Sequence, residues 1–224
     1  MEAGGSPNND AEEVIRRFHH LYYTRPHDTW LNTYWLGIPV LKSPLDMWIY
    51  HEILFQNRPD VVVESGTYHG GSAHFLACIC DLVGSGRVIT IDLPSGPEVP
   101  KNPAHPVHDR LTYVSGSSVA EETLAEVAGS IRPGEQVMVI LDSDHHKDHV
   151  LSELRAYAPM VSNGHYLIVE DTNINGNPVL AAYGPGPREA VEEFLGERDD
   201  FVVDSSREKY FLTFNPGGFL KRVK

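Results

Sequence analysis

The chain has 224 residues, 41% of them hydrophobic, which is enough for one globular domain with a large core. Its formal net charge of −13 repels phosphate backbones, and it has no local basic cluster, so nucleic acid is excluded as an expected partner. No apolar run is long enough to span a membrane, and the N-terminus lacks a signal pattern. Cys78 and Cys80 lie two apart on an expected helix and face different ways, so we expect reduced thiols and a cytoplasmic protein.

We expect three segments along the chain. Residues 1–9 are small and polar and predict a disordered tail, residues 10–58 form a helical and aromatic N-terminal segment, and residues 59–224 form the main domain. The stretch 29–37 is aromatic and low in charge. Either its side chains pack against the domain, or Trp30, Tyr34 or Trp35 lines a pocket. Exposed aromatic side chains in this segment would also suit a homo-oligomer.

The N-terminal segment contains two expected helices. The apolar spacing predicts the first over residues 10–23. The second begins at Ser43-Pro44, which is an N-cap followed by proline at the first helical position, and ends near Asn57.

From residue 59 onward, strands and helices alternate. The expected strands are 61–64, 88–92, 111–114, 137–142 and 166–171, followed by a closing pair at 201–203 and 210–214. The expected helices are 72–83, 119–128, 147–157 and 188–195, and residues 172–186 form a long loop. This alternation predicts an α/β fold with a doubly wound, mainly parallel, Rossmann-like sheet and an antiparallel C-terminal strand. Right-handed crossovers place the loops after the parallel strands at one edge of the sheet, where such folds bind ligands.

The first of these strands leads into a glycine turn and a helix, an arrangement typical of a nucleotide-like ligand site. The Gly-x-Gly-x-x-Gly spacing of a dinucleotide site is absent, because Tyr68 occupies the middle position. Glu64 at the strand end would repel a pyrophosphate, but it suits the amine of S-adenosylmethionine (SAM). Asp92, at the end of the neighbouring strand, can accept both ribose hydroxyls. The expected cofactor contacts are Glu64, Gly66, Thr67, Tyr68, Gly70, Ser72, Asp92, Ser117 and Asp142.

A second group of acids follows two later strands. Neighbouring parallel strands lie about 5 Å apart, so carboxylates at their ends would repel one another unless a cation lies between them. Oxygen ligands suit a hard divalent ion such as Mg²⁺. The expected metal ligands are Asp142, Asp144, Glu170 and Asp171, with Asp142 preferred to Asp144. The alternative for all of these acids is a helix-capping role.

Three histidines follow the third acidic strand end. His146-x-Asp148 has the spacing of an iron site, but residues two apart on a helix face different directions. We therefore interpret His146 and His149 as solvated helix residues. His145, three residues after Asp142, could reach a substrate hydroxyl as a general base.

These motifs resemble two groups of enzymes. Residues 64–72 are similar to the cofactor turn of the class I catechol O-methyltransferases, and Asp142 and Glu170-Asp171 fall where that group holds Mg²⁺. The closer resemblance is to the cephalosporin hydroxylase family, and it covers most of the chain. The segments that carry it are 32–37, 64–72, 142–145, 169–173 and 184–190.

The resemblance implies a class I methyltransferase fold that binds SAM and Mg²⁺ and acts in natural-product or sugar-modifying pathways. The expected function is therefore O-methylation of a small molecule with adjacent oxygens, with His145 where the catechol enzymes place a catalytic lysine. The rival interpretations are an iron and 2-oxo-acid hydroxylase and a non-catalytic SAM-binding protein.

Overall fold

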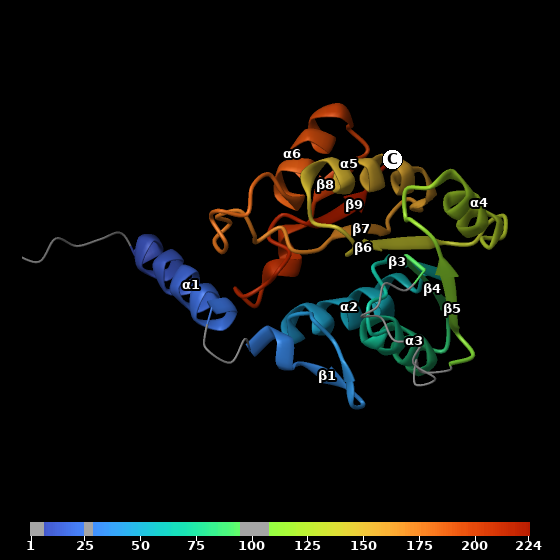
Figure 1. Cartoon of the computed structure of the whole chain (residues 1–224), viewed down its shortest axis with the longest axis horizontal. Coiled ribbons are helices and arrows are strands. Elements are labelled where there is room, and N and C mark those ends of the chain that lie inside the picture. The colour runs from blue at the N-terminus through green and yellow to red at the C-terminus, as the bar shows by residue number, and fades with distance from the viewer. Residues whose placement is uncertain (1–6, 25–28, 95–107) are drawn as a thin grey trace, which may run out of the picture.

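The computed structural model describes residues 7–24, 29–94 and 108–224. In this part of the chain, a seven-stranded sheet runs through the molecule with helices on both faces (Figure 1). Its strands are β3 (Val61–Ser65), β4 (Arg87–Asp92), β5 (Leu111–Ser115), β6 (Val137–Leu141), β7 (Tyr166–Val169), β8 (Phe201–Val203) and β9 (Phe219–Arg222). Across the sheet the order is β5-β4-β3-β6-β7-β9-β8. The chain reverses its direction of travel between β3 and β6, which is the point where such sheets bind ligands.

Strands β3 to β7 are parallel, whereas β9 is antiparallel to both of its neighbours, β7 and β8. The predicted doubly wound, mainly parallel sheet with an antiparallel strand near the C-terminus is therefore confirmed. The register pairs Glu64 with Thr90 on one side and with Ile140 on the other. The ends of these strands, and the acids that they carry, consequently lie at one edge.

Helices cover the two faces of the sheet because the strand side chains alternate between them. Val62, Met138 and Ile168 face a core formed with α2 (Pro44–Asn57) and α3 (Gly71–Val83). Val63, Val139 and Leu167 face a second core beneath α4 (Glu121–Gly129), α5 (Lys147–Tyr157) and α6 (Pro187–Glu197). Figure 1 shows α2 and α3 below the sheet and the other three helices above it.

The N-terminal segment contributes one helix and a small hairpin. Helix α1 (Pro7–Thr24) begins three residues earlier than predicted, and residues 1–6 of the predicted tail lie outside the described residues. A 3-10 turn, η1 (Thr29–Asn32), leads into β1 (Tyr34–Trp35), which pairs with β2 (Ile38–Pro39). The rings of Tyr22 and Tyr23 at the end of α1 meet Phe214 edge-on, with centroids 5.9 and 5.5 Å away. These contacts fasten α1 to the side of the domain.

The predicted strand at 210–214 is wrong. Its apolar side chains Leu212 and Phe214 are buried, but they follow a 3-10 turn, η3 (Ser205–Glu208), and pack as a loop. The Phe214 amide donates to the Asp46 carboxylate at 2.7 Å, so this backbone pairs with a side chain and not with a strand. The strand forms instead at β9, after the glycine pair at 217–218.

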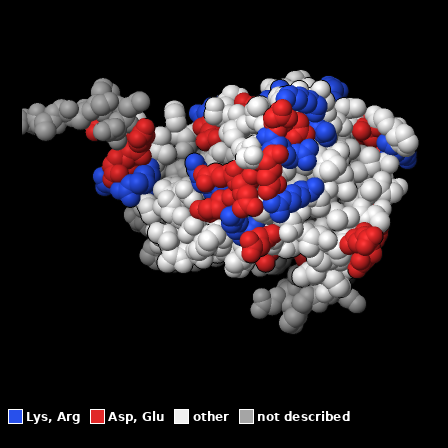
Figure 2. Space-filling model, turned by 90° about the horizontal axis from the view of Figure 1, so that it is seen from above, with Lys and Arg blue, Asp and Glu red and all other residues white. Residues whose placement is uncertain are grey.

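The outer face of α5 and α6 carries acidic and basic side chains side by side (Figure 2). The ion pairs there are Lys147–Glu193, Arg155–Glu193, Arg155–Glu197 and Arg188–Glu192. Exposed pairs of this kind contribute about 0–1 kcal/mol each, so this face is a solvated surface and its role in stability is small.

Candidate functional site

A cavity of about 690 Å³ lies over the carboxyl ends of β3, β4, β5 and β6. The predicted site residues that line it are Gly66, Thr67, Tyr68, Ser72, Asp92, Ser117, Asp142, Asp144, His145 and Asp171. Three other predicted residues, Glu64, Gly70 and Glu170, are buried and do not line this cavity. Of the aromatic candidates, Trp30 lines the cavity, Trp35 packs edge-on against Phe75 and Tyr34 is exposed.

The turn after β3 is built on two glycines with positive φ. Gly66 (φ +87°) donates its amide to the Ile91 carbonyl at 2.8 Å, and Gly70 (φ +77°) caps α3. These left-handed conformations favour glycine because a Cβ would be strained there. The turn leaves the N-terminus of α3 facing the cavity, where it can receive a polar ligand group.

Asp92 is held at the cavity wall by the backbone. The Tyr68 amide donates to its Oδ2 at 2.7 Å, and the Leu93 amide donates to its Oδ1 at 2.7 Å. Among the described residues each carboxylate oxygen accepts one backbone hydrogen bond, so the group has capacity to accept further ones from adjacent hydroxyls. This arrangement fits the two hydroxyls of a ribose.

Glu64 is completely buried behind the glycine turn. The Thr90 hydroxyl donates to its Oε2 at 2.8 Å, and its Oε1 has no hydrogen-bond partner among the described residues. Burial raises the pKa of this carboxyl, while the positive charge of Lys42 opposes the rise. A buried acceptor without a partner is costly, so Glu64 fits a ligand that brings a donor such as an amine.

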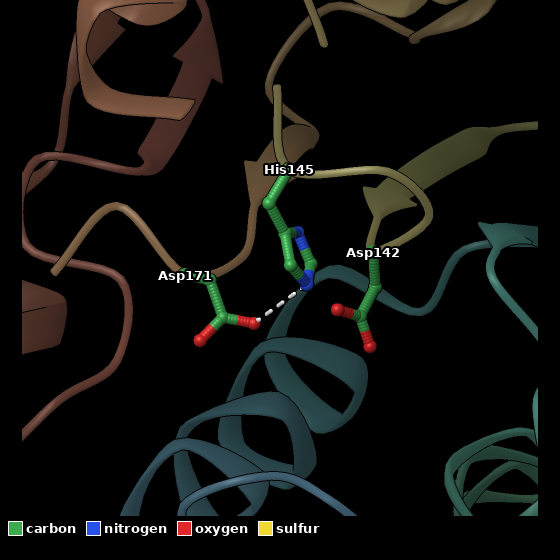
Figure 3. Close-up of side chains that lie close together, drawn as sticks. All are labelled: Asp142, His145 and Asp171. Atoms are coloured by element: carbon green, nitrogen blue, oxygen red, sulfur yellow. Dashed lines mark ion pairs between the residues drawn. The ribbon is translucent and has the colours of Figure 1, made fainter. Parts of the chain in front are cut away.

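Three side chains converge where β6 and β7 end (Figure 3). Asp142, His145 and Asp171 each offer a ligand atom, and these atoms lie within 4.8 Å of one another. The His145 Nε2 lies 3.3 Å from the Asp171 Oδ2, and the Asp142 carboxylate points toward the same ring. Two carboxylates and one imidazole are a donor set that fits a divalent cation.

The electrostatics of this group are those of acids crowded together in partly buried positions on a cavity wall. Burial raises the pKa of Asp142 to about 7, an effect opposed by Lys42. Burial also raises the pKa of Asp171, opposed by His145. Burial alone would lower the pKa of His145, but Asp171 and Asp142 outweigh it and raise that pKa. The site is therefore short of positive charge.

Lys42, in the loop between β2 and α2, is a site residue that sequence reasoning missed. Its Nζ lies 2.6 Å from the Asp142 Oδ2 and 2.7 Å from the Glu170 Oε1, and its side chain is 3% exposed. The Tyr50 hydroxyl donates to the same Glu170 oxygen. These contacts hold Glu170 against Lys42 and Tyr50 of α2, and Glu170 is not one of the three residues of the Asp142–His145–Asp171 group. No local pattern marks Lys42, since its partners lie 100 and 128 residues away.

Asp144 is not part of the Asp142–His145–Asp171 group. Its Oδ1 accepts from the His146 amide at 2.9 Å and contacts the His146 Nδ1 at 2.6 Å, at the exposed rim of the cavity. His146 is exposed, as predicted.

His149, predicted to be solvated, instead belongs to a polar network at the cavity wall. Its Nε2 lies 3.2 Å from the Ser118 Oγ and 3.1 Å from the Ser143 Oγ. The Ser143 hydroxyl donates at 2.7 Å to Glu153, which is fully buried.

A sheet of this order, with an acid at the end of β4 and a glycine turn after β3 on the wall of one cavity, is typical of class I SAM-dependent methyltransferases. Residues 27–223 match the family model described as Rhamnosyl O-methyltransferase/CmcI. The chain belongs to this family and is a SAM-dependent O-methyltransferase, which confirms the predicted family and enzyme class.

Similar sequences agree with this assignment, and similar structures agree with the fold. The chain is 39% identical to a rhamnosyl O-methyltransferase of Mycobacterium tuberculosis, covering 95% of this chain and 86% of that protein. It is 38% identical to one of Mycobacterium leprae, covering 94% and 91%. An apo CmcI structure superposes with a TM-score of 0.67 at 23% identity, covering 100% of this chain and 87% of that one. A CmcI structure described as an Mg–SAM complex superposes with a TM-score of 0.62 at 23% identity, covering 87% and 78%.

Proposed function

We propose that this enzyme transfers the methyl group of SAM to a hydroxyl of a small sugar-type acceptor, and that a divalent metal ion, most simply Mg²⁺, assists. The observation that carries the metal dependence is the pair of cavity carboxylates, Asp142 and Asp171, which each offer an oxygen within 4.8 Å of the other. The sugar acceptor is supported by the curated relatives, which are named rhamnosyl O-methyltransferases. The Mg–SAM complex of the CmcI structure supports the same pair of ligands here.

Different residues of the site would bind SAM and the metal ion. Asp92 would bind the ribose hydroxyls of SAM, and Glu64 would meet its amine from beneath the glycine turn. Bound SAM supplies a methyl group on a positively charged sulfur, and a bound divalent ion lowers the pKa of a hydroxyl that it contacts. Asp142 and Asp171 would hold that ion.

His145 is the proposed base. Its imidazole lines the cavity beside Asp171, with the His145 Nε2 3.3 Å from the Asp171 Oδ2. The Asp171 carboxylate would therefore stabilise the imidazolium that forms when His145 accepts the hydroxyl proton. Trp30, stacked on Tyr23 with 5.2 Å between ring centroids, supplies an apolar wall on the N-terminal side of the cavity. That wall would help to exclude water from the reacting groups.

Methyl transfer from labelled SAM to a panel of rhamnosides and other glycosides tests this proposal. We expect acceptor-dependent formation of S-adenosylhomocysteine that stops in excess chelator and returns with added Mg²⁺ or Mn²⁺. Full activity in chelator would contradict the metal assignment. SAM binding without transfer to any acceptor would favour a non-catalytic protein, and oxygen consumption with iron would favour the hydroxylase.

A further inference from the structure

Lys42 occupies an unusual position, because it places a fixed positive charge inside a site that is suited to a cation. The Nζ contacts Asp142, a proposed metal ligand, and Glu170, the acid next to the other ligand, Asp171. Both the Lys42 and Glu170 side chains are almost fully buried, so water screens these contacts very little.

Glu170 is held in place by more than this one ion pair. The Tyr50 hydroxyl donates to the Glu170 Oε1, and the Asn215 Nδ2 in turn donates to the Tyr50 hydroxyl at 2.8 Å. Asn215 is fully buried and also accepts the Asp171 amide through its Oδ1 at 3.1 Å. The two acids after β7 are thus fixed in different directions, with Glu170 toward Lys42 and Asp171 toward His145.

Asp142 lies between the Lys42–Glu170 ion pair and the His145–Asp171 pair. One of its oxygens contacts Lys42, and its carboxylate also belongs to the group that could hold a metal ion. A divalent ion bound there would lie close to a buried ammonium group, and the two like charges would repel each other. Lys42 would therefore weaken metal binding while compensating the acids when no metal is present.

We propose that Lys42 is a built-in counter-cation that competes with the divalent ion for Asp142 and sets the metal affinity of the site. This inference rests on the proposed metal site. Lys42 is then a positioning residue for the metal ligands. Without metal, its ammonium group compensates the charges of Asp142 and Glu170. With metal, repulsion between the ammonium group and the divalent ion limits the affinity for that ion.

Calorimetric titration of the full chain with MgCl₂ and with MnCl₂ tests this inference through Lys42→Met, which keeps the length of the side chain and removes its charge. We expect the variant to bind each ion at least tenfold more tightly than the wild type. Without metal its melting temperature should fall, and added metal should raise it by more than in the wild type. Tyr50→Phe is the matched control, since it removes a contact to Glu170 without changing charge, and its metal affinity should stay within about twofold of the wild type.

Should Lys42→Met fail to fold without metal, Lys42→Met/Glu170→Gln removes one charge of each sign and is compared with Glu170→Gln alone. We again expect at least tenfold tighter metal binding in the variant without Lys42. Equal or weaker metal binding by the variant without Lys42 would overturn the proposed role of Lys42. If the wild type still binds metal in that case, the proposed metal site is supported. No binding of either ion by any of these proteins would overturn both.

Discussion

The backbone carbonyl of Asp142 fills the space beside Gly66. A Cβ at Gly66 would lie 1.8 Å from that oxygen, and the Asp142 amide donates back to the Ser65 carbonyl at 3.0 Å. The cofactor turn and the candidate metal ligand are therefore in direct backbone contact. Any side chain at Gly66 must displace Asp142.

Gly66→Ala should disable both halves of the site. The overlap is with backbone, and φ is +87° at this position, so we expect a loss of about 3 kcal/mol or more of unfolding free energy. SAM binding and methyl transfer should both fall. Gly134→Ala is the control, because its φ is also positive (+89°) and a Cβ there meets no atom within 4 Å. Equal destabilisation of the two variants would show that φ alone matters.

Asp171→Asn should abolish metal-dependent activity while leaving SAM binding intact, because Asp171 belongs to the candidate metal group. Asp144→Asn is the matched control, since its side chain pairs with His146 at the rim of the cavity. We expect it to keep its metal affinity within a few-fold of the wild type. Calorimetry with MgCl₂ and with SAM measures both quantities, and loss of metal binding in Asp144→Asn would place the ion elsewhere.

His145→Gln should separate the roles of base and ligand. As the base, His145 contributes about 10² to 10⁴ in rate, so kcat should fall by that factor while the affinity for Mg²⁺ changes little. The pH dependence of kcat should lose its acidic limb, because the wild-type imidazole accepts a proton only when it is neutral. A parallel loss of metal binding would identify His145 as a ligand instead.

Asp92→Asn should weaken SAM binding. Replacing a carboxylate acceptor with an amide removes charge-assisted hydrogen bonds to hydroxyls, each worth about 1.5–3 kcal/mol, so the Kd for SAM should rise at least tenfold. Asp109→Asn, at an exposed position, is the control. An unchanged Kd in Asp92→Asn would remove Asp92 from the ribose site.

The stability of the protein should depend on the pH through Asp46. Burial raises its pKa to about 8, above the value near 4 of an unfolded chain. Between those values the folded state holds a proton that the unfolded state releases, so this carboxyl lowers stability as the pH rises from about 4 to about 8. The slope is about 1.4 kcal/mol per pH unit.

Asp46→Asn should remove this contribution while keeping an acceptor for the Phe214 amide. Denaturant unfolding at pH 5, 6, 7 and 8 compares the two slopes, with metal-free buffers throughout. Identical slopes in the two proteins would show that Asp46 stays ionised when folded.

The fold could be predicted from local signals. Helix α5 begins and ends at the predicted residues, and Pro159 shortly after its end disfavours its continuation. Ser43-Pro44 starts α2 with the predicted cap, because the Ser43 hydroxyl accepts a hydrogen bond from the Leu45 amide at 3.2 Å. The acids at the strand ends could be predicted to meet because parallel strands share an edge.

What could not be predicted depends on contacts that are distant in the sequence. The pairing of Lys42 with Asp142 and Glu170 leaves no periodicity or spacing to detect. Glu170 and Asp171 are adjacent carboxylates, yet Glu170 contacts Lys42 whereas Asp171, whose backbone is left-handed (φ +55°), lies beside His145. The residues at 210–214 resemble a strand in composition, but the Phe214 amide donates its hydrogen bond to the Asp46 side chain and not to a neighbouring strand.

The position of β9 has a consequence for how the enzyme matures. Strand β7, which delivers Glu170 and Asp171, has β6 on one side and β9 on the other, and β9 is some fifty residues further along the chain. Strands β3 to β7 precede β9 in the chain and can pair before β9 is made. Until β9 pairs with it, β7 is an edge strand, and Asn215 has not yet reached the Asp171 amide. The final placement of these acids should therefore depend on the last strand of the chain.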